Sequence, residues 1–134
     1  MSNTITHSLF SDFDINLFKA GKHYKLYEKF GAHILTLNGI KGTYFAVWAP
    51  TAKSVSVIGD FNFWNDQKHP LNVRWDESGI WEGFIPHAAK GESYKYKIHS
   101  SNDNIITEKA DPYARRCEHP PKTASIIWED DYAW

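Results

Sequence analysis

The chain has 134 residues, a length that suits one domain with its own hydrophobic core. Hydrophobic residues make up 42% and charged residues 23%, and 15 basic against 16 acidic side chains leave a net charge of −1. This balance argues against a nucleic-acid-binding protein, which needs a basic face. Cys117 is the single cysteine, which excludes an intramolecular disulfide and favours a reducing compartment.

No segment of the sequence is long and apolar enough to span a membrane, so no membrane partner is expected. Residues 1–15 lack a basic region followed by an apolar run, so no signal peptide is expected either. We therefore expect a cytoplasmic protein.

Residues 1–32 are predicted to form an N-terminal extension with one short helix. Ser11 and Asp14 have the spacing of a capping box, apolar residues after them can share one helix face, and Gly21 can end the helix.

From His33 onward the apolar residues follow the period of two that is typical of β-strands. Asn38-Gly39 has the chemistry of a tight hairpin turn, and Leu35 alternates with polar neighbours before it. Short strands with turn signals between them predict an all-β fold, an immunoglobulin-like β-sandwich over residues 33–128, with a linker starting at 129–134. The expected strands cover 43–48, 54–59, 71–75, 80–85, 94–98, 105–107 and 123–128, with an irregular stretch at 108–122.

The acidic residues and histidines do not suggest a catalytic or metal centre. Glycosyl chemistry needs two carboxylates at a fixed separation, but most acids here lie in turns or tails. Asp60 and Asp111 lie in better-defined segments, and we interpret both as turn-forming residues that bind nearby backbone amides. The seven histidines are scattered, and Cys117 with His119 supplies too few ligands for a metal site. No catalytic residue, metal or cofactor is expected.

Aromatic residues make up 16% of the chain, more than a domain this small is expected to bury completely. The segment 59–65, Gly-Asp-Phe-Asn-Phe-Trp-Asn, places three rings in one short polar loop after a predicted strand. An exposed indole can pack on the C–H-rich face of a sugar ring while the hydroxyls remain available for hydrogen bonds. For Phe61 we favour packing at the edge of the sandwich, whereas for Trp64 packing and sugar binding both remain open.

Three residues on the neighbouring strands complete the set of candidates. Lys95 lies on the outward face of the predicted strand 94–98, where it could donate to sugar hydroxyls or simply be solvated, the commoner case. Trp81 is predicted to lie in the core, and Trp75 stays ambiguous.

Several segments resemble carbohydrate-binding module family 48, whose members precede the catalytic barrels of α-glucan enzymes in the α-amylase superfamily. The resemblance covers roughly residues 22–134, and the tetrapeptide 30–33, Phe-Gly-Ala-His, points to bacterial 1,4-α-glucan (glycogen) branching enzymes, since debranching relatives usually lack its histidine. The motifs are 42–50 (GTYFAVWAP), 55–64 (VSVIGDFNFW), 79–82 (GIWE), 94–96 (YKY), 109–114 (KADPYA) and 121–125 (PKTAS).

The resemblance implies a non-catalytic domain that helps to hold α-1,4-glucan, as glycogen or maltooligosaccharides, near a separate catalytic barrel of the same chain. In that family the barrel cuts an α-1,4 chain and rejoins it through α-1,6 by a retaining glycosyl transfer, and it contains all the catalytic carboxylates. Residues 129–134 are then expected to start the linker to the barrel.

The resemblance also implies binding residues. In related glycogen-binding modules a loop Trp and a strand Lys contact glucan, and these match Trp64 and Lys95. Regulatory members have a second Trp platform where residues 99–105 contain no aromatic side chain, which predicts weaker binding that adds avidity to the barrel's own sites. Asn62, Asn102 and Asp103 are further candidates that could supply hydrogen bonds.

Two other functions remain open. The domain could be purely structural, docking on the barrel and stabilising it with its aromatic residues at the interface. It could also be a free-standing regulatory glycogen-binding subunit, although the tetrapeptide 30–33 weighs against that hypothesis.

Overall fold

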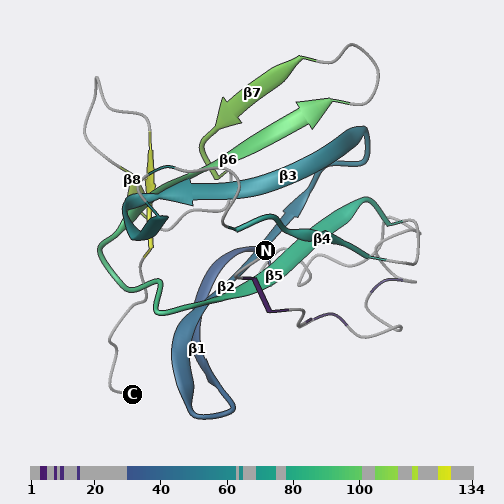
Figure 1. Cartoon of the computed structure of the whole chain (residues 1–134). Helices are drawn as coiled ribbons and strands as arrows, with labels where there is room; N and C mark the ends of the chain where they lie inside the picture. The colour runs from purple at the N-terminus through teal and green to yellow at the C-terminus, as the bar shows by residue number, and fades with distance from the viewer. Residues whose placement is uncertain are drawn as a thin grey trace.

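Two antiparallel sheets pack face to face in the computed structural model (Figure 1). Sheet A has the strand order β1-β2-β5-β4, and sheet B has the order β3-β6-β9-β8, with β7 paired to β6. The predicted all-β sandwich is therefore confirmed. The structure describes residues 4, 5, 8, 10, 15, 30–62, 64, 69–74, 78–100, 105–111, 116–117 and 124–127.

The strands follow the predicted segments closely, with two additions. The 3-10 helix η2 lies where a polar loop was expected, and β8 lies in the stretch expected to be irregular. The elements are β1 (Gly31–Leu37), β2 (Ile40–Trp48), β3 (Ala52–Gly59), η2 (Asp60–Asn62), β4 (Asn72–Val73), β5 (Ile80–Pro86), β6 (Ser93–Ser100), β7 (Ile106–Lys109), β8 (Arg116–Cys117) and β9 (Ser125–Ile126).

The hairpin between β1 and β2 forms at the predicted turn. Asn38 and Gly39 both have left-handed backbone conformations, with φ of 52° and 82°. Positive φ at both central residues defines the type I′ turn, whose twist matches that of the flanking strands. Leu37 consequently pairs with Ile40, and this pairing sets the register of the whole hairpin.

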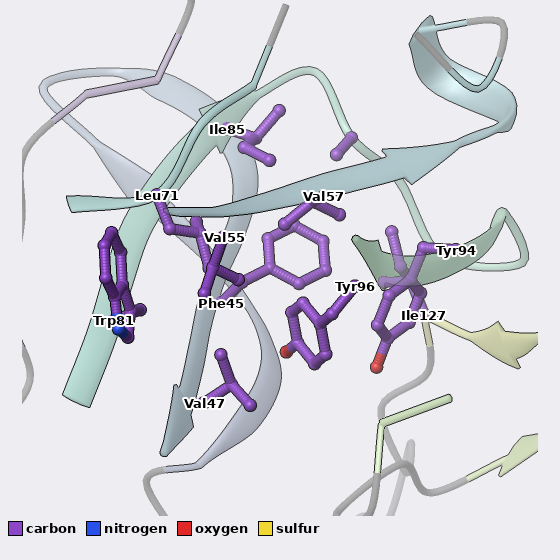
Figure 2. Packing of buried hydrophobic residues seen from close by; sticks show 11 residues of the cluster. Phe45, Val47, Val55, Val57, Leu71, Trp81, Ile85, Tyr94, Tyr96 and Ile127 are labelled. Carbon is purple, nitrogen blue, oxygen red and sulfur yellow. The ribbon is translucent and has the colours of Figure 1, made fainter. Parts of the chain in front are cut away.

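The core between the sheets is filled by alternate side chains of β2, β3, β5 and β6 (Figure 2). Trp81 is buried among them, as predicted, and its indole Nε1 donates to the Ala49 carbonyl over 3.1 Å. The ring of Phe45 lies at the centre, with its centroid 5.1 Å from that of Tyr94. The buried cluster comprises Phe45, Val47, Val55, Val57, Leu71, Trp81, Ile85, Ala88, Tyr94, Tyr96 and Ile127.

Sheet A is buried on its outer face as well, which explains why β2 reads as an almost unbroken apolar run. There Tyr44 and Phe84 pack with Phe10 and Ile15 from the N-terminal part of the chain. Ile5 forms two backbone hydrogen bonds with Phe84, of 2.8 and 2.9 Å. Residues before β1 thus pack directly on the sandwich.

The predicted N-terminal helix lies outside the described residues except for Ile15, whose backbone is helical. No helix among the residues described here is long and apolar enough to cross a membrane.

A buried ion pair lies beneath this N-terminal packing. The Arg74 guanidinium is 3.2 Å from Glu82 Oε2, and the Tyr44 hydroxyl donates to Glu82 Oε1 over 2.7 Å. Arg74 also donates to the Ser8 hydroxyl, and it lies over the ring of Phe10. Because a buried charge is costly without its partner, this network favours the observed packing of the N-terminal residues over alternatives.

A second buried polar cluster joins β6 to the C-terminal strands. The hydroxyls of Tyr94 and Tyr96 donate to Asp111 Oδ2 over 2.6 and 3.2 Å, and the Asp111 amide donates to Ser125 Oγ over 2.8 Å. Asp111 was interpreted as a turn residue that binds nearby amides, and the structure shows that its carboxylate accepts from two buried tyrosine hydroxyls distant in the sequence. The residues next to Asp111 in the sequence give no sign of these distant partners, which only the fold brings close to it.

Replacing Asp111 with alanine should destabilise the domain. Two buried tyrosine hydroxyls would lose their acceptor, at roughly 1–3 kcal/mol for each unsatisfied group, so Asp111→Ala should lower the free energy of unfolding by at least about 2 kcal/mol. Urea denaturation measures the change. Glu108→Ala on exposed β7 is the control and should stay within about 0.5 kcal/mol. Equal stability of the two variants would contradict the assigned role.

Stability should also fall in alkaline solution because of Tyr96. Burial, and then the neighbouring Asp111 carboxylate, raises the pKa of the Tyr96 phenol well above its ordinary value of 10.0. Above that pH the unfolded chain releases this proton while the folded chain retains it, so the contribution to stability is complete below pH 10 and is lost as the pH rises toward the folded pKa. Denaturation between about pH 9 and 11 should show a shallower decline for Tyr96→Phe than for the parent. Identical slopes would exclude Tyr96 as the cause.

Candidate functional site

The candidate site is built where β3 ends and η2 begins, against the start of β6 (Figure 1). A Cβ atom on Gly59 would lie 2.4 Å from the Ser93 carbonyl oxygen, so the close approach of the two strands requires glycine. Asp60 Oδ2 accepts from the Ser93 amide over 2.9 Å. Asp60 thus binds a backbone amide, as predicted, but one on a distant strand rather than nearby.

Asn62 has a different role from the one predicted for it. Its side chain is only 1% exposed, and its Oδ1 accepts from the Gly59 amide over 3.0 Å. Its Nδ2 donates to the Val57 carbonyl over 2.9 Å and lies 2.8 Å from His69 Nδ1. With both ends of the amide used inside the loop, Asn62 positions the loop and is not available to contact a ligand.

The two described rings of this loop point in different directions. Phe61 packs against the core cluster, with its ring centroid 6.2 Å from that of Phe45 and 5.5 Å from that of His69. This matches the packing role predicted for Phe61. Trp64, in contrast, is 40% exposed.

The backbone of Trp64 is held in an unusual conformation. Its amide donates to the Gly59 carbonyl over 3.0 Å, and its φ is 60°. A left-handed backbone costs an L-residue roughly 1–2 kcal/mol, and such strain persists only where the surroundings impose it. The hydrogen bond to Gly59 provides such a restraint, so the exposed indole is carried on a backbone position that is held at the end of β3.

Lys95 lies at the same end of sheet B as Trp64. Gly59, which binds the Trp64 amide, is in register with Tyr94, and Ile58 is in register with Lys95. Tyr94 and Tyr96 point into the core, so Lys95 projects from the outer face, where it is half-buried. The fold therefore brings these two predicted residues to one region. Asn102, Asp103 and Trp75 lie outside the described residues.

This surface can bind a neutral polyol. An exposed indole offers an apolar platform, and a lysine from the same end of sheet B offers hydrogen-bond donors. Among the residues that the structure describes, no group of three or more His, Cys, Asp or Glu side chains is placed to hold a metal ion.

Removing the Asn62 amide should destabilise this loop. Asn62→Ala leaves the Gly59 amide and the Val57 carbonyl without their partner, so we expect the free energy of unfolding to fall by about 1–3 kcal/mol. Asn62→Asp should also be destabilised, because a carboxylate can accept from Gly59 but cannot donate to Val57. Thermal and urea denaturation measure both effects, with Ser54→Ala, at an exposed position of β3, as the control. A fully stable Asn62→Ala variant would exclude this role.

Known proteins similar to this chain include two 1,4-alpha-glucan branching enzymes GlgB. The enzyme from Thermosynechococcus vestitus is 53% identical over 125 residues, which are 92% of this chain and 16% of the relative. The enzyme from Aquifex aeolicus is 49% identical over 127 residues, which are 95% of this chain and 20% of the relative. The chain thus spans a fifth or less of the length of these relatives, and the predicted resemblance to branching enzymes is confirmed.

Solved structures with a similar fold include two pullulanases. The Bacillus acidopullulyticus enzyme has a TM-score of 0.56 and 22% identity, covering 75% of this chain and 12% of that one, so this likeness concerns the fold alone. The Klebsiella pneumoniae pullulanase complexed with maltotriose has a TM-score of 0.54 and 28% identity, covering 75% of this chain and 9% of that one.

The family model of carbohydrate-binding module 48, the isoamylase N-terminal domain, matches residues 29–114. This range extends from the start of β1 through β7, and it includes the η2 loop, Trp64 and Lys95. Because the match covers more than half of the sequence, the chain belongs to the carbohydrate-binding module 48 family.

Proposed function

We propose that this chain is the non-catalytic N-terminal domain of a cytoplasmic 1,4-α-glucan branching enzyme. It binds α-1,4-glucan and holds it near a catalytic barrel, which transfers α-1,4 chains to α-1,6 positions during glycogen synthesis. The observation that carries the proposal is the exposed Trp64 indole on a restrained loop, at the same end of sheet B as Lys95. The branching-enzyme relatives support the reaction class.

The arrangement suggests how the domain binds glucan. The C–H face of a glucose unit packs on the Trp64 indole, where apolar contact and dispersion favour binding. Lys95 donates hydrogen bonds to hydroxyls at the edge of the sugar. Because the loop is held by Gly59 and Asn62 before the ligand arrives, little conformational entropy is lost on binding.

The domain boundaries fit this proposal as follows. The proposed carbohydrate-binding domain covers residues 33–128, with its first strand starting two residues earlier at Gly31, and the residues before this strand form an extension that packs on sheet A through Phe10 and Ile15. Residues 129–134 begin the linker to the barrel. One platform gives a weak site, whose contribution is added to that of the barrel's own subsites.

A structural domain docked on the barrel is the second candidate. It is favoured by Val73 and Ile5, which are 52% and 38% exposed and lie along the same edge of β5 in sheet A. Exposed apolar side chains at a sheet edge are suited to contact another polypeptide. The regulatory-subunit hypothesis is less favoured, since the relatives described above are branching enzymes.

Trp64→Ala tests the binding function. We expect the affinity for maltoheptaose to fall roughly tenfold, because a platform Trp is a binding hot spot. Trp64→Phe, which keeps a smaller ring, should lose less. Isothermal titration calorimetry with maltoheptaose and affinity electrophoresis in glycogen gels measure the effects.

The control for this experiment is Val73→Ala, at an apolar position that is also exposed but lies in sheet A. It should leave glucan affinity unchanged. If the parent protein bound no maltoheptaose, or if Trp64→Ala bound it as well as the parent, the Trp64 site would be excluded and the docking role favoured.

A further inference from the structure

His69 lies beside β3 and the η2 segment, close to where the chain continues to Trp64. Its backbone is fixed by pairing with β3, because the His69 carbonyl accepts from the Val57 amide over 3.0 Å. Its ring is fixed by packing, since the ring centroid lies 5.5 Å from that of Phe61. The residue is only 7% exposed. A histidine is thus buried among the residues that form the candidate site.

The hydrogen bonds of Asn62 determine which form of this ring the fold accepts. The Gly59 amide can only donate and the Val57 carbonyl can only accept, so the Asn62 side-chain oxygen binds the first and its nitrogen the second. The same nitrogen lies 2.8 Å from His69 Nδ1. Because an amide nitrogen donates and does not accept, Nδ1 must be the acceptor. The His69 ring is therefore neutral in this arrangement, with its hydrogen on Nε2.

A second proton on the ring would disrupt this contact. Both nitrogens of an imidazolium are donors, so an N–H on Nδ1 would be directed at the donor nitrogen of Asn62. The described neighbours Phe61 and Asn62 carry no charge. Asp60, the acidic residue of η2, uses its Oδ2 to accept from the Ser93 amide over 2.9 Å. On protonation, Asn62 would have to release His69 or turn its amide away from the backbone groups that it binds.

Gly59 connects the Asn62–His69 pair to the exposed indole. The Gly59 amide donates to Asn62, and the Gly59 carbonyl accepts from the Trp64 amide over 3.0 Å. Trp64 has a φ of 60°, a left-handed conformation that an L-residue keeps only where its surroundings impose it. A change in the contacts of Asn62 therefore acts on the residue that holds the Trp64 backbone.

We propose that His69 is a positioning residue for glucan, whose neutral ring holds Asn62, and through it Gly59 and Trp64, in the conformation that binds the sugar. Protonation of the ring on acidification then weakens glucan binding, although His69 itself does not contact the sugar. Histidine is the side chain whose charge ordinarily changes between about pH 5 and 8. This inference rests on the proposed glucan-binding function and adds to it a pH dependence that begins at His69.

Calorimetric titration of the chain with maltoheptaose at about pH 7.5 and at about pH 5 tests the proposal. We expect the affinity of the parent to fall about three- to tenfold at the lower pH, the equivalent of one lost hydrogen bond. His69→Asn places an amide oxygen close to the position of Nδ1, where it can accept from Asn62 without titrating, so its affinity should be similar at both pH values. His69→Ala has no acceptor, so its affinity should be low at both.

His33→Gln is the matched control. His33 binds the Phe30 carbonyl from β1 in sheet A, and a glutamine can still donate to that carbonyl. This variant should keep the pH dependence of the parent. Equal affinity of the parent at both pH values, or a decline that His69→Asn shares, would overturn the inference and leave the Trp64 site intact.

A second measurement needs no sugar. In ¹⁵N spectra of the histidine rings, His69 should carry a hydrogen on Nε2 and none on Nδ1 at neutral pH. The side-chain amide of Asn62 and the backbone amide of Trp64 should shift together as the ring takes up its second proton. A hydrogen on Nδ1 at neutral pH, or a titration of His69 that leaves both amide signals in place, would also overturn the inference.

The two measurements separate this inference from the proposed function. If the parent bound no maltoheptaose at either pH, the proposed function would be overturned, and the spectra would still decide whether His69 positions the backbone at Trp64.

Discussion

The side-chain amide of Asn62 supplies hydrogen-bond partners at the point where β3 leaves its sheet. A strand that ends inside a protein exposes backbone groups that must find new partners. Asn62 accepts from the Gly59 amide and donates to the Val57 carbonyl, and it does so from the end of a 3-10 helix one turn away. The chain can therefore reverse direction while remaining buried. The segment that returns beside β3 is held by the same residue, through His69.

The surplus of aromatic residues also has a physical explanation. Sheet A is covered on both faces, so its rings fill two clusters instead of one. The buried tyrosines also satisfy their hydroxyls with hydrogen bonds. Tyr44 donates to Glu82, and Tyr94 donates to Asp111. Among the tryptophans that the structure describes, Trp48 and Trp64 lie outside both clusters and are substantially exposed.

Alternation and turn chemistry were sufficient to predict most of the fold. Asn38-Gly39 encodes its own turn, and the strand around Tyr94 and Tyr96 shows its period of two directly. β8 escaped prediction because a two-residue strand is too short to display a period. η2 also escaped prediction, because its three residues are too few to display a helical period.

The site was predictable only in part, because the sequence does not show where a polar side chain points. Asn62 was named as a residue that could supply hydrogen bonds to glucan, yet its partners are backbone groups and His69, which only the fold brings together. Trp64 and Lys95 matched motifs, and their juxtaposition follows from strand register.

Two exposed indoles share one physical feature, Trp48 at the end of β2 in sheet A and Trp64 just beyond the end of β3 in sheet B. Each tryptophan donates a hydrogen bond to a backbone carbonyl. The Trp48 indole Nε1 donates to Ser78, and the Trp64 backbone amide donates to Gly59. In each case a nearby glycine permits an approach that any side chain would block. β3 runs between the two, from the residues that follow Trp48 to the residues that precede Trp64, and it is paired with β6.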